Sequence, residues 1–177
     1  GGNTAAFITA SGVTLVDTKN PGWGQPLLDK VKTLTDKPVT RVINTHTHYD
    51  HTSGNVAMPA TVEIVAHAMT SKNLAAGNPV TGLGATPNVF KDNPGKGLIK
   101  RTFTDKLTIG SGADQINLHY FGPAHTGGDA FVEDARALHD DGRVRKRRPA
   151  FRIDHGSVLE HERRARPRHG ERGGEKP

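Results

Sequence analysis

Apolar residues recur at every second position, or in short runs, along most of the first 134 residues. This spacing is typical of β-strands that bury one face or both faces. A Ser-Gly pair at residues 11–12 is expected to form the turn that connects the first two runs. The pattern predicts strands over residues 5–10, 13–16, 39–44, 61–66, 99–103, 106–109, 115–121 and 129–132.

Two helices are expected between these strands. The first covers residues 25–34 and has an apolar face at helical spacing, made of Leu27, Leu28, Val31 and Leu34. The second covers residues 68–76 and ends at Gly77. Residues 78–98 are rich in Gly, Pro and Asn and are expected to form a loop, and loops of this length are usually functional or disordered.

Composition divides the chain near residue 134. Residues 1–134 carry equal numbers of basic and acidic side chains, whereas residues 135–177 carry the whole net charge of +6 and most of the arginines. The tail has few apolar residues, so it cannot bury much surface. We therefore expect a folded domain over residues 1–134 and a basic, Arg-rich tail over residues 135–177. The tail is either poorly ordered in part or an aberrant continuation, such as a shifted reading frame.

Bulk properties exclude several classes of protein. A length of 177 residues suits one domain with a core. The chain has no cysteine, which excludes disulfides and thiolate ligands. No apolar run reaches the length of a membrane span, and no signal peptide is visible. Cytoplasm and periplasm are equally open as compartments, and the sequence does not give the oligomeric state.

The chemistry of the chain is concentrated in six residues just after the strand predicted over residues 39–44. These residues are His46-Thr47-His48-Tyr49-Asp50-His51. Burying three imidazoles and a carboxylate without partners is costly, but a divalent metal provides a partner for each of them. His46 and His48 are two positions apart, so in an extended segment their side chains face the same way. The cluster therefore predicts a metal site.

Asp50 and His51 are expected in the turn that follows, where they can point to a neighbouring position and serve a second ion. Two-metal hydrolases hold their ions about 3.5–4 Å apart. A further ligand for the first ion must come from elsewhere in the chain, and His125 is the best candidate. It lies in a loop flanked by Gly and Pro at the end of a predicted strand, where scaffolds place functional groups.

Two motifs together resemble the metallo-β-lactamase superfamily over roughly residues 5–134. They are His46-x-His48-x-Asp50-His51 and Gly122-Pro123-Ala124-His125-Thr126-Gly127-Gly128-Asp129. The resemblance implies an α/β fold, the four-layer αββα sandwich of that family, incomplete at its C-terminal end. It also implies one zinc ion held by His46, His48 and His125, with Asp50 and His51 serving a second zinc.

The resemblance further implies hydrolysis of a small molecule, in which a hydroxide bound to zinc attacks a carbonyl or ester carbon. The cation makes this nucleophile available near neutral pH, and Asp50 orients it. The substrate classes open at this point are a β-lactam, a lactone and a thioester. The absence of cysteine argues against the lactamase subclass that uses a cysteine on the second zinc.

The chain departs from the family pattern after the second motif. The family supplies an Asp that bridges both metals, and the corresponding stretch offers only Asp140 or Asp141, at a different position. A last family histidine lies in a Pro-Gly-His turn, whereas His155, His161 and His169 have Arg-rich surroundings without such a turn. The second metal site is therefore unassigned in part.

Three alternatives to a zinc hydrolase stay open. Imidazole and carboxylate ligands also suit iron, so an iron enzyme of sulfur or oxygen chemistry in the same superfamily is one. A catalytically impaired fragment that binds metal without turnover is another. A nucleic-acid partner for the basic tail ranks low, because residues 1–134 carry no net charge.

Overall fold

The computed structural model describes residues 2–77 and 88–134, together with the backbone of residues 150–153 and 158–160. The larger of its two sheets has the strand order β10-β9-β1-β2-β3-β4-β5. Strands β2 to β5 run parallel to one another, and β1 pairs antiparallel with β2 and β9. The strands of this sheet are β1 (Thr4–Thr9), β2 (Gly12–Val16), β3 (Val39–Ile43), β4 (Glu63–His67), β5 (Arg101–Phe103), β9 (Ala150–Ile153) and β10 (Val158–Glu160).

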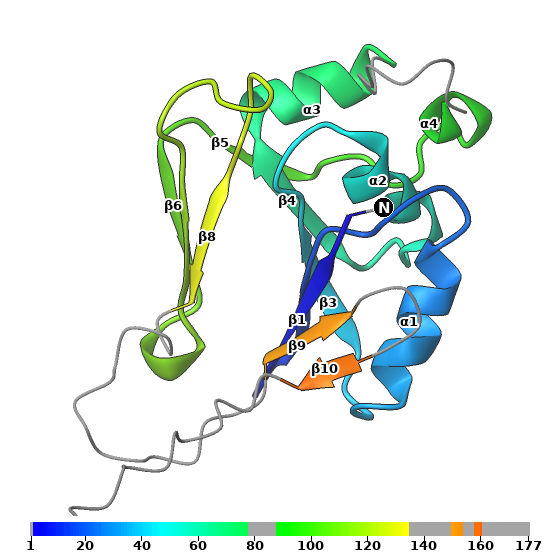
Figure 1. The fold of residues 1–177 in the computed structure, drawn as a ribbon, viewed down its shortest axis with the longest axis vertical. Coiled ribbons are helices and arrows are strands. Elements are labelled where there is room, and N and C mark those ends of the chain that lie inside the picture. Colours follow the sequence, from blue (N-terminus) through cyan, green and yellow to red (C-terminus); the bar gives the residue numbers. More distant parts are fainter. Residues whose placement is uncertain (1, 78–87, 135–149, 154–157, 161–177) are drawn as a thin grey trace, which may run out of the picture.

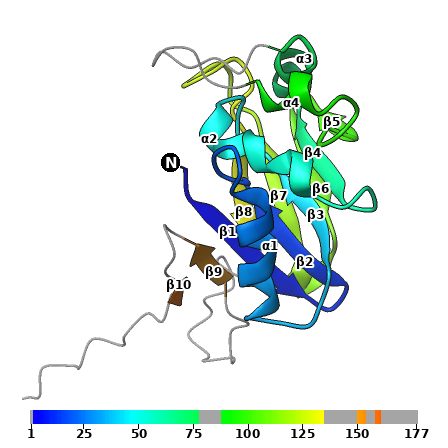
Figure 2. The same cartoon turned by 90° about the vertical axis from the view of Figure 1, so that its right-hand side faces the viewer.

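The smaller sheet is an antiparallel meander of three strands, β6 (Lys106–Ile109), β7 (Ile116–His119) and β8 (Phe131–Asp134). The helical segments are α1 (Gly24–Lys32), α2 (Tyr49–Thr52), the 3₁₀ helix η1 (Ser53–Ala57), α3 (Ala68–Ala75), α4 (Val89–Asp92) and the 3₁₀ helix η2 (Gly112–Asp114). Figure 1 shows the two sheets side by side, with α1 on the face of the larger sheet that points away from the smaller one, and Figure 2 shows α1 in front of the larger sheet.

The central strands β2, β3 and β4 of the larger sheet have buried residues on both faces, because neighbouring residues of each of these strands enter different cores. Leu15, Val42 and Ile64 pack with Leu27 and Val31 of α1 on one face. Their chain neighbours Val16, Ile43 and Val65 pack on the other face against the smaller sheet, which contributes Ile109, Ile116 and Leu118. All residues of β2 are therefore buried. This arrangement sets the carboxyl end of β3, where the histidine cluster begins, between the two layers of strands.

The described residues form three of the four layers that the sequence predicted, a helical layer and two sheets. On the outer face of the smaller sheet, Phe121 and Phe131 are exposed and their rings contact each other, with centroids 5.2 Å apart. No helix formed by the described residues is long and apolar enough to cross a membrane.

Most predicted elements are present; β4, β5 and β8 each begin two residues later than predicted, and two further segments differ in kind. Asp50 and His51 lie in the single turn of α2 rather than in an irregular turn, because the backbone N–H of Thr52 and its hydroxyl both donate to the carbonyl of His48. The predicted loop 78–98 contains α4, while residues 78–87 lie outside the described residues. Strand β8 begins two residues late, since the Asp129 carboxylate accepts hydrogen bonds within the preceding loop.

The Arg-rich tail is described only in part. Strands β9 and β10 lie within residues 135–177 and extend the larger sheet beyond β1. Residues 135–149, 154–157 and 161–177 lie outside the described residues. The division at residue 134 therefore stays a prediction.

We expect Gly54→Ala to destabilise the fold. A Cβ atom at residue 54 would lie 2.0 Å from the carbonyl oxygen of Thr18, so the backbone of η1 has to move away from the segment after β2. Overpacking of this kind costs about 1–3 kcal/mol of unfolding free energy, measurable by chemical denaturation. Gly127→Ala is the control, because a Cβ there meets nothing within 4 Å. Equal stability of the two variants would contradict the expectation.

Candidate metal centre

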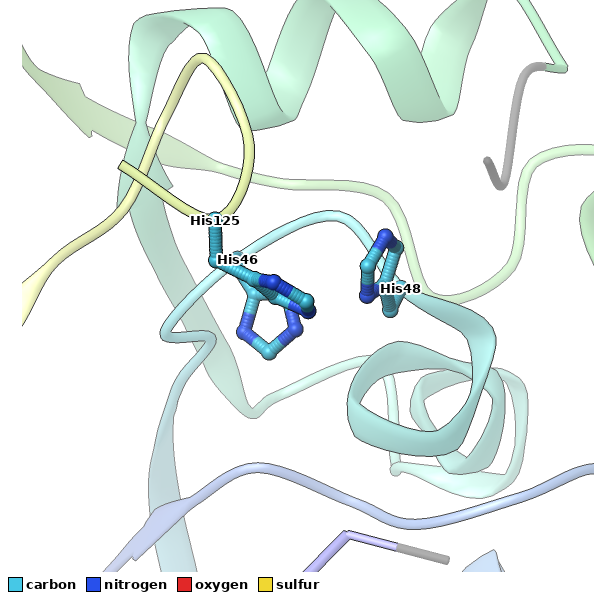
Figure 3. A group of neighbouring side chains, drawn as sticks. All are labelled: His46, His48 and His125. Carbon is cyan, nitrogen blue, oxygen red and sulfur yellow. The ribbon is translucent and has the colours of Figure 1, made fainter. Parts of the chain in front are cut away.

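Three imidazoles from two distant segments meet at the end of β3. His46 and His48 follow β3 directly, and His125 comes from the loop between β7 and β8 (Figure 3). The ring centroid of His125 lies 5.1 Å from that of His46 and 4.5 Å from that of His48. The centroids of His46 and His48 are 4.8 Å apart. One nitrogen of each ring lies within 4.8 Å of the others. The structure therefore brings together all three histidines that the sequence selected for a first metal.

The hydrogen bonds around His46 fix which of its nitrogens carries the proton. The Thr45 hydroxyl donates its single hydrogen to Asp17 Oδ2 at 2.7 Å, so it can only accept from His46 Nδ1, 2.9 Å away. Neutral His46 then presents the bare lone pair of Nε2. This nitrogen is buried and has no hydrogen-bond partner among the described residues. A metal ion supplies the missing partner, because neutral imidazole nitrogen is a common zinc ligand.

Burial and neighbouring charges favour the neutral form of His46 and His48. Burial, followed by the charge on His51, lowers the pKa of His46 to about 4, and the nearby Asp17 opposes this shift only in part. Burial and then His125 lower the pKa of His48. His46 and His48 resist protonation because burial, and then the neighbouring imidazoles, disfavour their charged form. At neutral pH the nitrogens of these two rings are thus available to a cation.

Asp50 and His51 lie beside the triad, on α2. The ring centroid of His51 is 4.1 Å from that of His46, and its Nε2 lies 3.6 Å from Asp50 Oδ2. Its Nδ1 donates to Asp17 Oδ2 at 2.6 Å. Burial alone would lower the pKa of His51, but the hydrogen bond to Asp17 and the charges of Asp17 and Asp50 outweigh it and raise this pKa. The arrangement leaves His51 Nε2 and the Asp50 carboxylate facing one another next to the triad.

Asp17 is the residue that the sequence reasoning missed. Its side chain is buried and joins the site through three hydrogen bonds, from Thr45 N at 2.8 Å, from the Thr45 hydroxyl and from His51. Its backbone has a φ of 64°, a conformation that Asp tolerates better than most residues. An acidic residue directly after a wholly buried strand is the one signal that could have pointed to it.

The other predicted candidates separate clearly. His67 caps α3, since its Nδ1 accepts from Met69 N at the start of that helix. His119 lies on the outer face of the smaller sheet and contacts Glu133. The candidates for the bridging carboxylate and the last histidine, Asp140, Asp141, His155, His161 and His169, all lie outside the described side chains.

Comparison with known proteins gives one family. The family model of the metallo-beta-lactamase superfamily matches residues 1–137. A hydroxyacylglutathione hydrolase of Polaromonas sp. is 31% identical in an alignment 137 residues long, which covers 64% of this chain and 52% of the relative. The chain thus spans about half the length of the curated relative that it matches.

Solved structures agree on the fold. A metallo-β-lactamase from Pontibacter korlensis superposes with a TM-score of 0.58 at 24% identity, covering 74% of this chain and 54% of that one. A subclass B3 metallo-β-lactamase of Bradyrhizobium japonicum gives a TM-score of 0.57 at 19% identity, covering 89% of this chain and 53% of that one. At these identities the likeness concerns the fold alone.

We expect Thr45→Val to weaken zinc binding by roughly 10–100-fold, the range found for groups that orient a ligand without touching the metal. The substitution removes the acceptor that holds the proton on His46 Nδ1. Thr45→Ser keeps a hydroxyl and is expected to restore most of the affinity. Competition with a chromophoric chelator measures both variants, and unchanged affinity in Thr45→Val would refute the role of this hydroxyl.

Proposed function

The chain belongs to the metallo-β-lactamase superfamily, and from this premise we propose that it is a metal-dependent hydrolase of a small molecule. His46, His48 and His125 hold one Zn²⁺ ion, and the bond that is cleaved joins a carbonyl or ester carbon to its leaving group. The observation that carries the proposal is the convergence of three imidazoles, one of which has a buried nitrogen without a hydrogen-bond partner among the described residues.

The donor set fits zinc well. Three histidines with a fourth position open to water are a recurrent arrangement in catalytic zinc sites. A zinc ion bound there supplies a Lewis acid that polarises the substrate oxygen and makes water acidic near neutral pH. His46 is the most buried of the three ligands and His125 the most exposed. A small substrate would therefore reach the triad from the side of His125, away from the core.

Asp50 is the residue proposed to act on the nucleophile. Its carboxylate lies on α2 directly after His48, and its negative charge opposes the lowering of the His48 pKa. A carboxylate at this place accepts a hydrogen bond from the attacking water and orients it toward the substrate carbon. His51 Nε2, 3.6 Å from Asp50 Oδ2, completes a pair that offers one nitrogen and one oxygen to a second ion.

A thioester is the substrate class that we favour. The sequence leaves β-lactam, lactone and thioester open, and the curated relative is named as a hydroxyacylglutathione hydrolase. The solved structures named as metallo-β-lactamases share less than 25% identity with the chain, so they add no weight to a β-lactam. Because the chain spans about half of the curated relative, the activity of the whole protein is part of the proposal.

Iron is the competing metal, since imidazole and carboxylate ligands suit both ions. We propose zinc because the three ligands that converge are all histidines, a set found in zinc hydrolases. Metal analysis of protein purified without added metal separates the two. One equivalent of iron with no zinc would replace the hydrolase proposal by the iron enzyme.

His125→Ala is expected to weaken zinc binding by more than the roughly 100-fold upper limit for orienting residues, and to abolish hydrolysis of thioester, lactone and β-lactam probes. The reason is that it removes one of three ligand nitrogens. His119→Ala is the matched control, because that histidine lies on the outer face of the smaller sheet, bonded to Glu133. It should bind zinc and turn over substrate like the unmodified chain.

Two outcomes would count against the proposal. If the unmodified chain binds no zinc, or if His125→Ala binds it as tightly as His119→Ala, the triad is not the metal site. If zinc binds at one equivalent but none of the three probe classes is hydrolysed, the chain is the metal-binding fragment without turnover that the sequence left open.

A further inference from the structure

The loop of residues 120–130 carries His125 to the triad, and its internal hydrogen bonds set only its local shape. The Asp129 carboxylate accepts from Thr126 N at 2.8 Å, from the Thr126 hydroxyl at 3.1 Å and from Ala124 N at 3.3 Å. These bonds close the turn around His125. They do not determine where the turn lies relative to His46 and His48, which belong to another part of the chain.

The returning limb of the loop rests on the start of α3. The hydroxyl of Thr70, which is fully buried, donates to the carbonyl of Gly128 at 2.9 Å. Gly128 packs so closely that a Cβ atom there would lie 2.5 Å from Thr70 Oγ1 and 2.7 Å from Thr70 N. Figure 1 shows this loop, in yellow, reaching the beginning of α3. The contact requires a glycine on the loop and a hydroxyl on the helix.

The outgoing limb is held at the same place by an aromatic stack. The ring centroids of Tyr120 and His67 lie 3.9 Å apart, and the planes of the two rings are inclined by 18°. His67 is itself fixed, because Nδ1 accepts from Met69 N and Nε2 therefore donates to the carbonyl of Thr104 at 3.2 Å. The Tyr120 hydroxyl also crosses the loop and donates to the carbonyl of Gly127 at 3.1 Å.

These contacts connect His125 to His46 and His48 through β3, β4 and α3. Strand β3 leads to His46 and His48, and it pairs in parallel with β4, which ends at His67 and continues into α3. Thr70 and His67 then hold the two limbs of the loop. A third tie comes from Ala130 N, which donates to the carbonyl of Thr45 at 2.7 Å, next to His46.

We propose that Thr70 is a positioning residue for the metal centre, acting through Gly128 to hold His125 within reach of the other two ligands, with the His67–Tyr120 stack as a second anchor. This proposal rests on the proposed function, because it takes the triad to bind a cation. A loop without the Thr70 anchor samples more conformations, and metal binding must then order it at a cost in entropy. The affinity falls while the number of ions bound stays the same.

The first test compares matched threonine variants. Thr70→Val keeps the side-chain shape and removes the hydroxyl, and it is expected to weaken zinc binding roughly 10-fold, with one ion still bound at saturation. Thr70→Ser should restore the affinity. Thr33→Val is the control, because the Thr33 hydroxyl likewise donates to a backbone carbonyl, that of Lys30 at the end of α1. Unchanged affinity in Thr70→Val, or equal losses in both valine variants, overturns the proposal.

The second test separates positioning from general support of the fold. In a chain that already carries His125→Ala, Thr70→Val has no ligand left to position, so it should cause no further loss of zinc affinity. An equal loss in both backgrounds shows a structural role and overturns the positioning role alone. If His125→Ala itself leaves zinc affinity unchanged, the proposed function fails, and the positioning role falls with it.

A pair of neighbouring glycines gives an independent check. Gly128→Ala pushes the loop away from Thr70 and should weaken zinc binding about as much as Thr70→Val. Gly127→Ala adds a methyl group where nothing lies within 4 Å, and its affinity should match that of the unmodified chain. Circular dichroism of each metal-free variant confirms that it is folded. Equal affinity of the two glycine variants in folded protein overturns the proposal.

Discussion

The rest of the centre depends on the hydrogen bonds that the Asp17 carboxylate accepts. This carboxylate is buried at the end of β2, where an unpaired carboxylate would be strongly unfavourable. Three donors compensate it, and they come from the segment after β3 and from α2. The same bonds that satisfy this charge set the proton position on His46 and orient His51. The same hydrogen bonds thus stabilise the buried charge and orient the histidines. They also connect the end of β2 to the metal centre.

The fold was predictable where the alternation of apolar residues was clear. Val42 and Ile43 are neighbours that enter different cores, and the sequence pattern of β3 showed a buried strand before its partners were known. The His46-x-His48 spacing was equally informative, because alternation in an extended segment places both rings on one side. His125 could be selected only from its sequence motif and not from the spacing of residues along a strand. Its approach to His46 depends on how β7 and β8 pack against the larger sheet.

The remainder could not be read from local patterns because it arises from contacts between distant segments. Asp17 and Thr45 are 28 positions apart, and the only local signal for either is that Asp17 directly follows a buried strand. Thr70 and Gly128 are likewise distant, 58 positions apart. α2 was missed because a single helical turn is too short to show a helical period. Side-chain hydrogen bonds of this kind become visible only after the strands have been placed.

The three histidines are held by different means, and this difference has a thermodynamic consequence. His46 is fixed by burial and by the Thr45 hydroxyl, whereas His125 is exposed and depends on the anchoring of its loop. Leaving the buried Nε2 of His46 without a partner costs about 1–3 kcal/mol in a metal-free chain. A cation bound by the triad would remove that cost and at the same time join the loop to β3. Binding of such an ion would therefore be coupled to stability, and His46 would contribute to this coupling through a nitrogen that is already buried without a partner among the described residues.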